Sequence, residues 1–127
     1  MNLFALFTLF IVLSATTCSK NEYHRYIHLQ NNSNKPIYFL GTFSFPDTTL
    51  LSEKYKPVKA YKLMPSEKNI IETKVFAYNP TLQVFIFDAT IIEQEPWDSI
   101  VKKYKVLKRY QFTKQEIENR DWTVTYP

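Results

Sequence analysis

The sequence predicts a mainly β domain: an antiparallel β-sandwich with two short helices, of which an immunoglobulin-like arrangement is one form. An α+β fold is the alternative. Apolar residues alternate along several segments, as they do in strands with one buried face. Aromatic residues, which favour strands, are frequent, with 10 Phe, 9 Tyr and 2 Trp. Residues 82–87 are apolar on both faces except at Gln83, which indicates a strand covered on both sides.

The other strands are predicted from alternation and from the turn residues between them. The alternating positions define the first two strands and the last one: Ile27 and Leu29; Ile37, Phe39, Phe43 and Phe45; Trp122, Val124 and Tyr126. Residues 31–36 concentrate turn-forming residues, so the first two strands are expected to form a hairpin. A second pair is expected over residues 58–63 and 70–76, turning at residues 64–67, and residues 106–112 are the remaining candidate strand.

Two short helices are predicted near the C-terminus. The first begins near Pro96, and its apolar stripe is formed by Trp97, Ile100, Val101 and Tyr104. The second begins at Thr113, where residues 113–116 form a capping box, and ends before residue 119.

Residues 1–18 differ sharply in composition from the rest of the chain. They carry no charged side chain, whereas all 16 Lys and Arg and all 12 Asp and Glu follow position 19. The apolar run over residues 3–13 is shorter than the about 20 residues that span a bilayer, but it has the length of a signal-peptide hydrophobic region. Small and hydroxyl residues then lead to Cys18, the only cysteine. The composition therefore indicates an exported chain.

The sequence Ala15-Thr16-Thr17-Cys18 resembles the lipobox of bacterial lipoproteins, in which the cysteine carries the lipid and becomes the mature N-terminus. This resemblance implies a signal peptide over residues 1–17, a lipidated Cys18 with a short tether over residues 18–23, and one globular domain over residues 24–127. Ala15 stands where the family usually has Leu, and Thr17 is bulkier than the usual residue there. The alternative is cleavage by ordinary signal peptidase, which would leave Cys18 as a free thiol on a soluble secreted protein.

The connection at residues 31–38 and segments of the last 40 residues resemble small uncharacterised lipoproteins of Gram-negative bacteria. These segments are residues 87–90, 96–100, 104–110 and 122–127. The resemblance implies a place in the cell envelope, at the outer membrane, and no known activity. We expect a binding or assembly module whose partners are the membrane, through lipid on Cys18, and an envelope protein or glycan, but not nucleic acid. The alternatives are a small hydrolase acting on envelope polysaccharide and a soluble secreted binding protein.

Few residues suggest chemistry. Gly41 is the only glycine, which argues against phosphate-binding loops and nucleophile elbows. His24 and His28 would lie about 13 Å apart on a strand, too far to hold one metal. With no catalytic motif, we expect no enzyme activity, cofactor or metal site. A hydrolase would instead require acidic residues that converge in a cleft, for which the candidates are Asp88, Glu93, Glu95 and Asp98.

Two further features each have two interpretations. The sequences Asp47-Thr48-Thr49 and Asp98-Ser99-Ile100 resemble the acceptor sequence of a bacterial O-glycosylation system, which makes Thr48 and Ser99 candidate acceptors. The alternatives are an Asx turn at Asp47 and a solvated helix position at Ser99. The net charge of +4 indicates either ordinary solubility or attraction to an anionic lipid surface.

Overall fold

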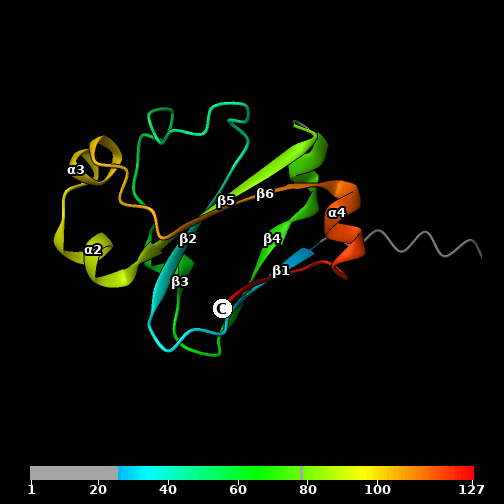
Figure 1. Cartoon of the computed structure of the whole chain (residues 1–127), viewed down its shortest axis with the longest axis horizontal. Coiled ribbons are helices and arrows are strands. Elements are labelled where there is room, and N and C mark those ends of the chain that lie inside the picture. The colour runs from blue at the N-terminus through cyan, green and yellow to red at the C-terminus, as the bar shows by residue number, and fades with distance from the viewer. Residues whose placement is uncertain (1–25, 78) are drawn as a thin grey trace, which may run out of the picture.

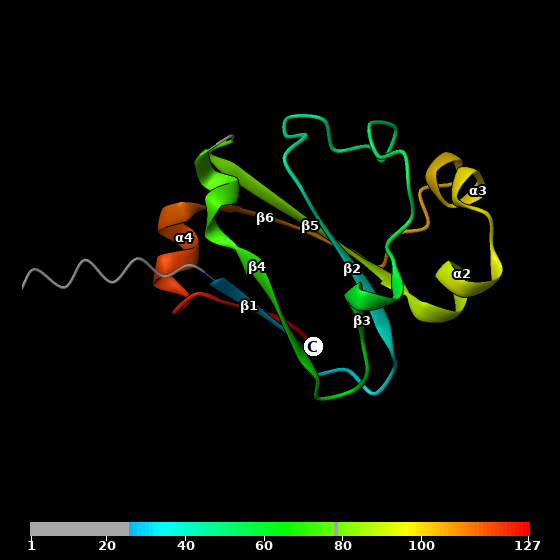
Figure 2. The same ribbon diagram turned by 180° about the vertical axis from the view of Figure 1, so that it is seen from behind.

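The computed structural model describes residues 26–77 and 79–127, which form two β-sheets (Figures 1 and 2). The first sheet has the strand order β4 (Lys68–Glu72), β1 (Tyr26–Asn31), β7 (Thr123–Tyr126). The second has the order β3 (Lys62–Leu63), β2 (Ile37–Thr42), β5 (Thr81–Asp88), β6 (Lys108–Thr113). Strands β1 and β7 are parallel, and the other neighbouring strands are antiparallel. The prediction of a mainly β fold is therefore confirmed.

Five short helices connect these strands: 3-10 helices η1 (Lys59–Tyr61) and η2 (Thr73–Ala77), and α-helices α2 (Ala89–Gln94), α3 (Trp97–Lys102) and α4 (Lys114–Asn119), all within the described residues. Helix α3 follows Pro96, as predicted. Helix α4 has the predicted capping box, because the Glu116 N–H donates to Thr113 Oγ1 and the Thr113 N–H donates to the Glu116 carboxylate. Helix α2 was not predicted. It begins directly after β5, where the Asp88 carboxylate accepts hydrogen bonds from the N–H groups of Thr90 and Ile91.

Strand β5 separates two clusters of buried side chains. Leu82, Val84 and Ile86 face the first cluster, to which strands of both sheets and α4 contribute. Phe85 and Phe87 face the second cluster, which α2 and α3 cover. Every residue from position 81 to position 87 is buried, so the prediction of a central strand covered on both sides is confirmed.

The two predicted hairpins are wrong. Strand β1 pairs with β4 and β7, whereas β2 pairs with β3 and β5, so residues 31–36 connect the two sheets. Residues 64–67 likewise connect β3 in one sheet to β4 in the other. Turn residues and alternation favour a hairpin and a crossing between sheets equally, because both need a reversal between strands with one buried face. The choice depends on partners that are distant in the sequence.

The side chain of Asn31 holds these two crossings together. It is fully buried, and its Nδ2 donates to the carbonyl oxygens of Lys35 at 2.8 Å and Leu63 at 3.1 Å. Its Oδ1 accepts from the N–H and the hydroxyl of Ser33. Its main-chain N–H donates to Glu67 and its carbonyl accepts from Ser66, which has a φ of 69°. One residue therefore connects the end of β1 to both crossings.

We predict that Asn31→Ala lowers the free energy of unfolding by about 3 kcal/mol, because it removes the donors to the buried Leu63 carbonyl and the Lys35 carbonyl and takes the acceptor from Ser33. Urea denaturation measures this change. The exposed neighbour Asn32 is the matched control, and Asn32→Ala is expected to change the value by less than about 0.5 kcal/mol. Equal midpoints for the two variants would contradict the role assigned to Asn31.

Candidate functional site

An apolar groove lies between β2 of one sheet and β4 of the other. We call it the β2–β4 groove. It has a volume of about 440 Å³, and its lining comes from β2, η1, β4 and the residue after β2: Phe39, Leu40, Gly41, Phe43, Tyr61, Ile70, Ile71 and Glu72. Glu72 is the only charged member of this lining. The surface of the groove is therefore mostly apolar.

Two features of the backbone keep the groove open. Strand β3 pairs only with Ile37 and Tyr38, and the chain before it forms η1 instead of continuing along β2. At that end the Tyr61 ring packs edge-on against Phe39, with centroids 5.2 Å apart. Farther along, Gly41 contributes no side chain, and a Cβ there would lie 3.5 Å from Ile71 Cδ1. The groove thus occupies space that a longer β3 and a larger residue would fill.

Large apolar side chains around the groove remain exposed to solvent. The exposed fractions are 49% for Phe43, 43% for Tyr61 and 46% for Ile70. Single exposed apolar residues are ordinary, but a group of them around a hollow is typical of an interaction surface. We therefore treat the β2–β4 groove as the main candidate site.

A second hollow lies between α3 and the loop that follows β2. We call it the α3 hollow. It has a volume of about 790 Å³, and its lining comes from both segments: Thr49, Leu51, Glu53, Lys54, Trp97, Asp98, Val101, Lys102 and Tyr104. The indole of Trp97 donates to the Glu53 carbonyl at 2.9 Å, and the Tyr104 hydroxyl donates to the Thr48 carbonyl at 3.2 Å. These two bonds attach the loop to α3 and the residues just after it.

The α3 hollow contains a carboxyl group with altered acidity. Burial raises the pKa of the Glu53 carboxyl, and the negative charge of Asp47 raises it further. Hydrogen bonds from the Thr49 hydroxyl and N–H lower the pKa of Asp47, which keeps that charge in place. Asp98 lines the same hollow, so two carboxyl groups and two aromatic rings lie around it. Aromatic rings and carboxyl groups are the side chains that sugar-binding clefts use.

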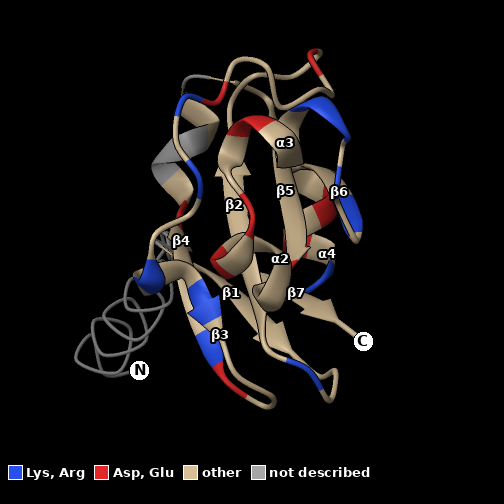
Figure 3. Ribbon diagram, turned by 90° about the vertical axis from the view of Figure 1, so that its left-hand side faces the viewer, with Lys and Arg blue, Asp and Glu red and all other residues tan. Residues whose placement is uncertain are grey.

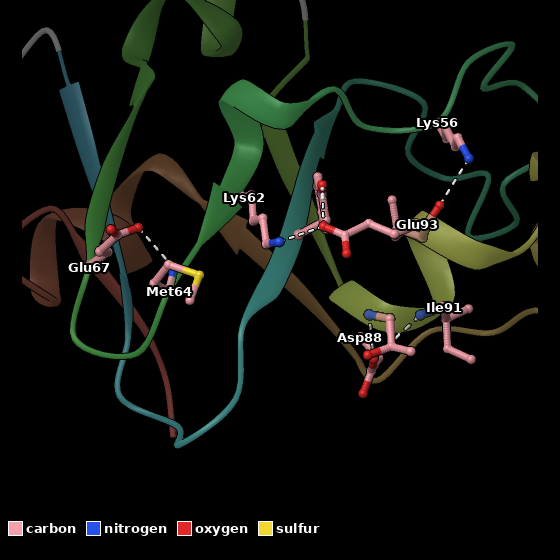
Figure 4. A network of polar contacts seen from close by, with 10 residues as sticks. Lys56, Lys62, Met64, Glu67, Asp88, Ile91 and Glu93 are labelled. Carbon is pink, nitrogen blue, oxygen red and sulfur yellow. Dashed lines mark hydrogen bonds and ion pairs between the residues drawn. The ribbon is translucent and has the colours of Figure 1, made fainter.

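The four carboxylates proposed for a hydrolase do not meet in one cleft. Asp88 caps α2, and Glu93 accepts from the Tyr38 hydroxyl and pairs with Lys62 (Figure 4). Burial raises the pKa of the Tyr38 hydroxyl, and its hydrogen bond to Glu93 raises this pKa further. Glu93 is the one acidic residue within α2, and Figure 3 shows this helix beside the basic strand β3.

The other two carboxylates also have separate surroundings. Glu95 pairs with Lys105 at 2.6 Å. Of the four, Asp98 alone lines the α3 hollow. The acidic residue that joins it there is Glu53, which sequence reasoning missed because its position beside α3 depends on a hydrogen bond from Trp97, 44 residues away.

The two candidate glycosylation sequences lie at the same hollow. Thr49 of the first and Asp98 of the second both line it. Thr48 is exposed in the loop, whereas Ser99 is half-buried on α3. Asp47 accepts from the Thr49 N–H, which is the Asx turn expected as the alternative.

Other predicted positions fall outside the candidate sites. Cys18, the signal peptide and His24 lie outside the described residues. His28 is exposed on β1, opposite Ile70 of β4. In the described ranges, no three His, Cys, Asp or Glu side chains lie close enough together to hold a metal ion. The helices of the described part of the chain are all too short to cross a membrane.

Comparisons of the chain with protein-family models, with curated proteins and with solved structures found no match. The candidate sites are therefore interpreted from their own geometry.

We predict that Glu53 titrates above the ordinary Glu pKa of 4.5 and that Asp47→Asn lowers its midpoint, because the variant removes a neighbouring negative charge. A raised pKa means that the stability from protonated Glu53 is present at low pH and is lost as the pH rises through that pKa. Glu53→Gln is therefore expected to raise the thermal midpoint at pH 7. Carboxyl titration by NMR and thermal unfolding measure these effects, with the exposed Glu118→Gln as control. A Glu53 midpoint below 4.5 would contradict the assignment.

Proposed function

We propose that this chain is a lipid-anchored binding protein of the bacterial cell envelope, held at the outer membrane by lipid on Cys18. The observation that carries the binding function is the β2–β4 groove, with its half-exposed Phe43, Tyr61 and Ile70. A partner that covered these side chains would gain about 25 cal/mol for each Å² of apolar surface removed from water. This gain needs no catalytic group, so the groove supports a binding function directly.

We further propose that the two sheets form a β-sandwich of immunoglobulin-like type. Side chains of both sheets in the first buried cluster support this, among them Ile27 of β1 and Val84 of β5. In such an arrangement strand edges stay exposed on any side where no strand joins the two sheets. The edges of β2 and β4 are of this kind.

The lipid anchor is supported by Cys18 following a charge-free apolar segment of signal-peptide length. We predict that the mature protein from its native host begins at Cys18 and carries two or three acyl chains, which give stable anchoring where one chain would not. Intact-mass measurement and membrane fractionation test this, and Cys18→Ser is expected to leave the membrane fraction. A lipid-free mature chain that begins at Ala15 or Thr16 would contradict the anchor and leave the binding site untouched.

The groove is tested by site-specific photo-crosslinking in the native host. We predict that a benzoylphenylalanine in place of Ile70 gives discrete adducts, because the side chain lines the groove and is 46% exposed. The matched control is the same substitution at Tyr55, which is 80% exposed and is not part of the groove lining. Identical adduct patterns at the two positions would show that the groove has no selective partner.

A further inference from the structure

We infer that the partner at the β2–β4 groove is an extended peptide segment, which adds as a strand to the outer edge of β2 at Gly41. This inference rests on the proposed binding function of the groove and specifies the chemistry of its partner.

The register of β2 directs the main-chain groups of Gly41 into the groove. The Ala89 N–H donates to the Pro36 carbonyl at 3.3 Å, which fixes the alternation along the β2–β5 ladder. In an antiparallel pair, alternate residues bond to a given neighbour, so Tyr38, Leu40 and Thr42 face β5. Gly41 therefore directs its N–H and C=O toward the opposite edge.

That edge of β2 has no strand beside Gly41 within the described chain. The pairing with β3 ends at Tyr38 and Lys62. Beyond this point β2 carries no charged residue up to its end at Thr42, whereas β4 on the other side of the groove carries Lys68 and Glu72. Charged residues on an edge discourage strand addition, and their absence on a flat apolar edge permits it. The exposed edge suited to a new strand is thus that of β2.

The glycine itself favours a peptide as the occupant. A strand glycine allows another backbone to approach closely, and the atoms nearest to the missing Cβ of Gly41 belong to the side chains of Ile71 and Leu82, at 3.5 Å or more. An acyl chain would also fit an apolar groove, but it would leave the Gly41 N–H and C=O without partners, which is costly once water is removed. A peptide backbone supplies a carbonyl and an N–H at that place, and its side chains cover the apolar walls.

The side chains of the groove define what the peptide must carry. The open stretch of β2 and the residue after it, positions 39–43, correspond to about 16 Å of extended chain at about 3.3 Å per residue. A segment of four to six residues fills this length. Apolar side chains at alternate positions would face the groove lining, and polar ones would face solvent.

The test uses one blocked peptide, acetyl-Lys-Val-Thr-Val-Thr-Val-Lys-amide, and two derivatives that are N-methylated either at every Val or at every Thr. The N–H groups of successive residues lie on opposite edges of a strand, so for a given strand direction with the Val side chains on the groove only one derivative can still pair with β2. Binding is measured on the mature protein in phosphatidylcholine nanodiscs. We expect one derivative to bind about tenfold or more weakly than the parent and the other to bind as the parent does.

Hydrogen exchange gives a second readout on the protein. The parent peptide is expected to slow exchange in the segment that contains Gly41, and Gly41→Pro, which removes the N–H, is expected to weaken binding by a similar factor. If Gly41→Pro fails to fold, the two methylated peptides still decide the question.

Three outcomes would overturn the inference: equal binding of the two methylated peptides, no binding of the parent peptide, or a dimer that the peptide does not dissociate. Equal binding would show adsorption to an apolar surface alone. Selective crosslinking at Ile70 together with any of these outcomes would retain the binding function and reject strand addition as its mode.

Discussion

The arrangement of the two sheets depends on one buried amide. Asn31 lies where β1 ends, and its side chain binds the carbonyls of Lys35 in one crossing and Leu63 at the start of the other. Its main-chain bonds to Ser66 and Glu67 complete the second crossing. A buried amide with partners for its donors and its acceptor is specific in a way that apolar packing is not, because each alternative geometry leaves a polar group unpaired.

The groove is a consequence of this arrangement. Because both crossings meet at Asn31, β2 and β4 leave the same junction in different sheets, and no strand of residues 26–77 or 79–127 bridges the space between them. Strand β3 ends after two residues, and η1 is held against β4 by the Asn69 side chain, which donates to the Ala60 carbonyl at 2.8 Å. Beyond η1, Gly41 has no side chain to fill the groove. The junction at Asn31 thus stabilises one end of the sheets and also leaves the edge of β2 open at the other end.

Local patterns in the sequence were sufficient for some elements and not for others. Strand β5, helix α3 and helix α4 were predicted because their signals are local: a continuous apolar run, a proline before an apolar stripe, and a capping box. Helix α2 was missed because Ile91 and Ile92 continue the apolar pattern of β5, and its cap, Asp88, looks like an ordinary strand end.

The two crossings between the sheets and the candidate sites depend on distant partners, which is why the sequence alone did not predict them. The turn after Asn31 leads into the other sheet, and the Asn31 side chain there binds the carbonyl of Leu63, 32 residues away. The position of Glu53 at the α3 hollow likewise depends on Trp97, 44 residues away, whose indole donates to the Glu53 carbonyl. Gly41 did carry a local signal, since a lone glycine within a strand indicates close approach of another backbone. That signal points to the groove but not to β4, which forms its far wall.

The groove lies near the N-terminal end of β1, the end to which the proposed anchor is connected by the chain. Tyr26, the first residue of β1, pairs with Glu72, which lines the groove. Seven residues separate Cys18 from Tyr26, and they span at most about 25 Å. A domain anchored at Cys18 would therefore hold the groove close to the headgroups. A partner segment that emerges from a membrane protein would meet the open edge of β2 at high effective concentration. Even a short strand of four to six residues with low intrinsic affinity would then occupy the groove.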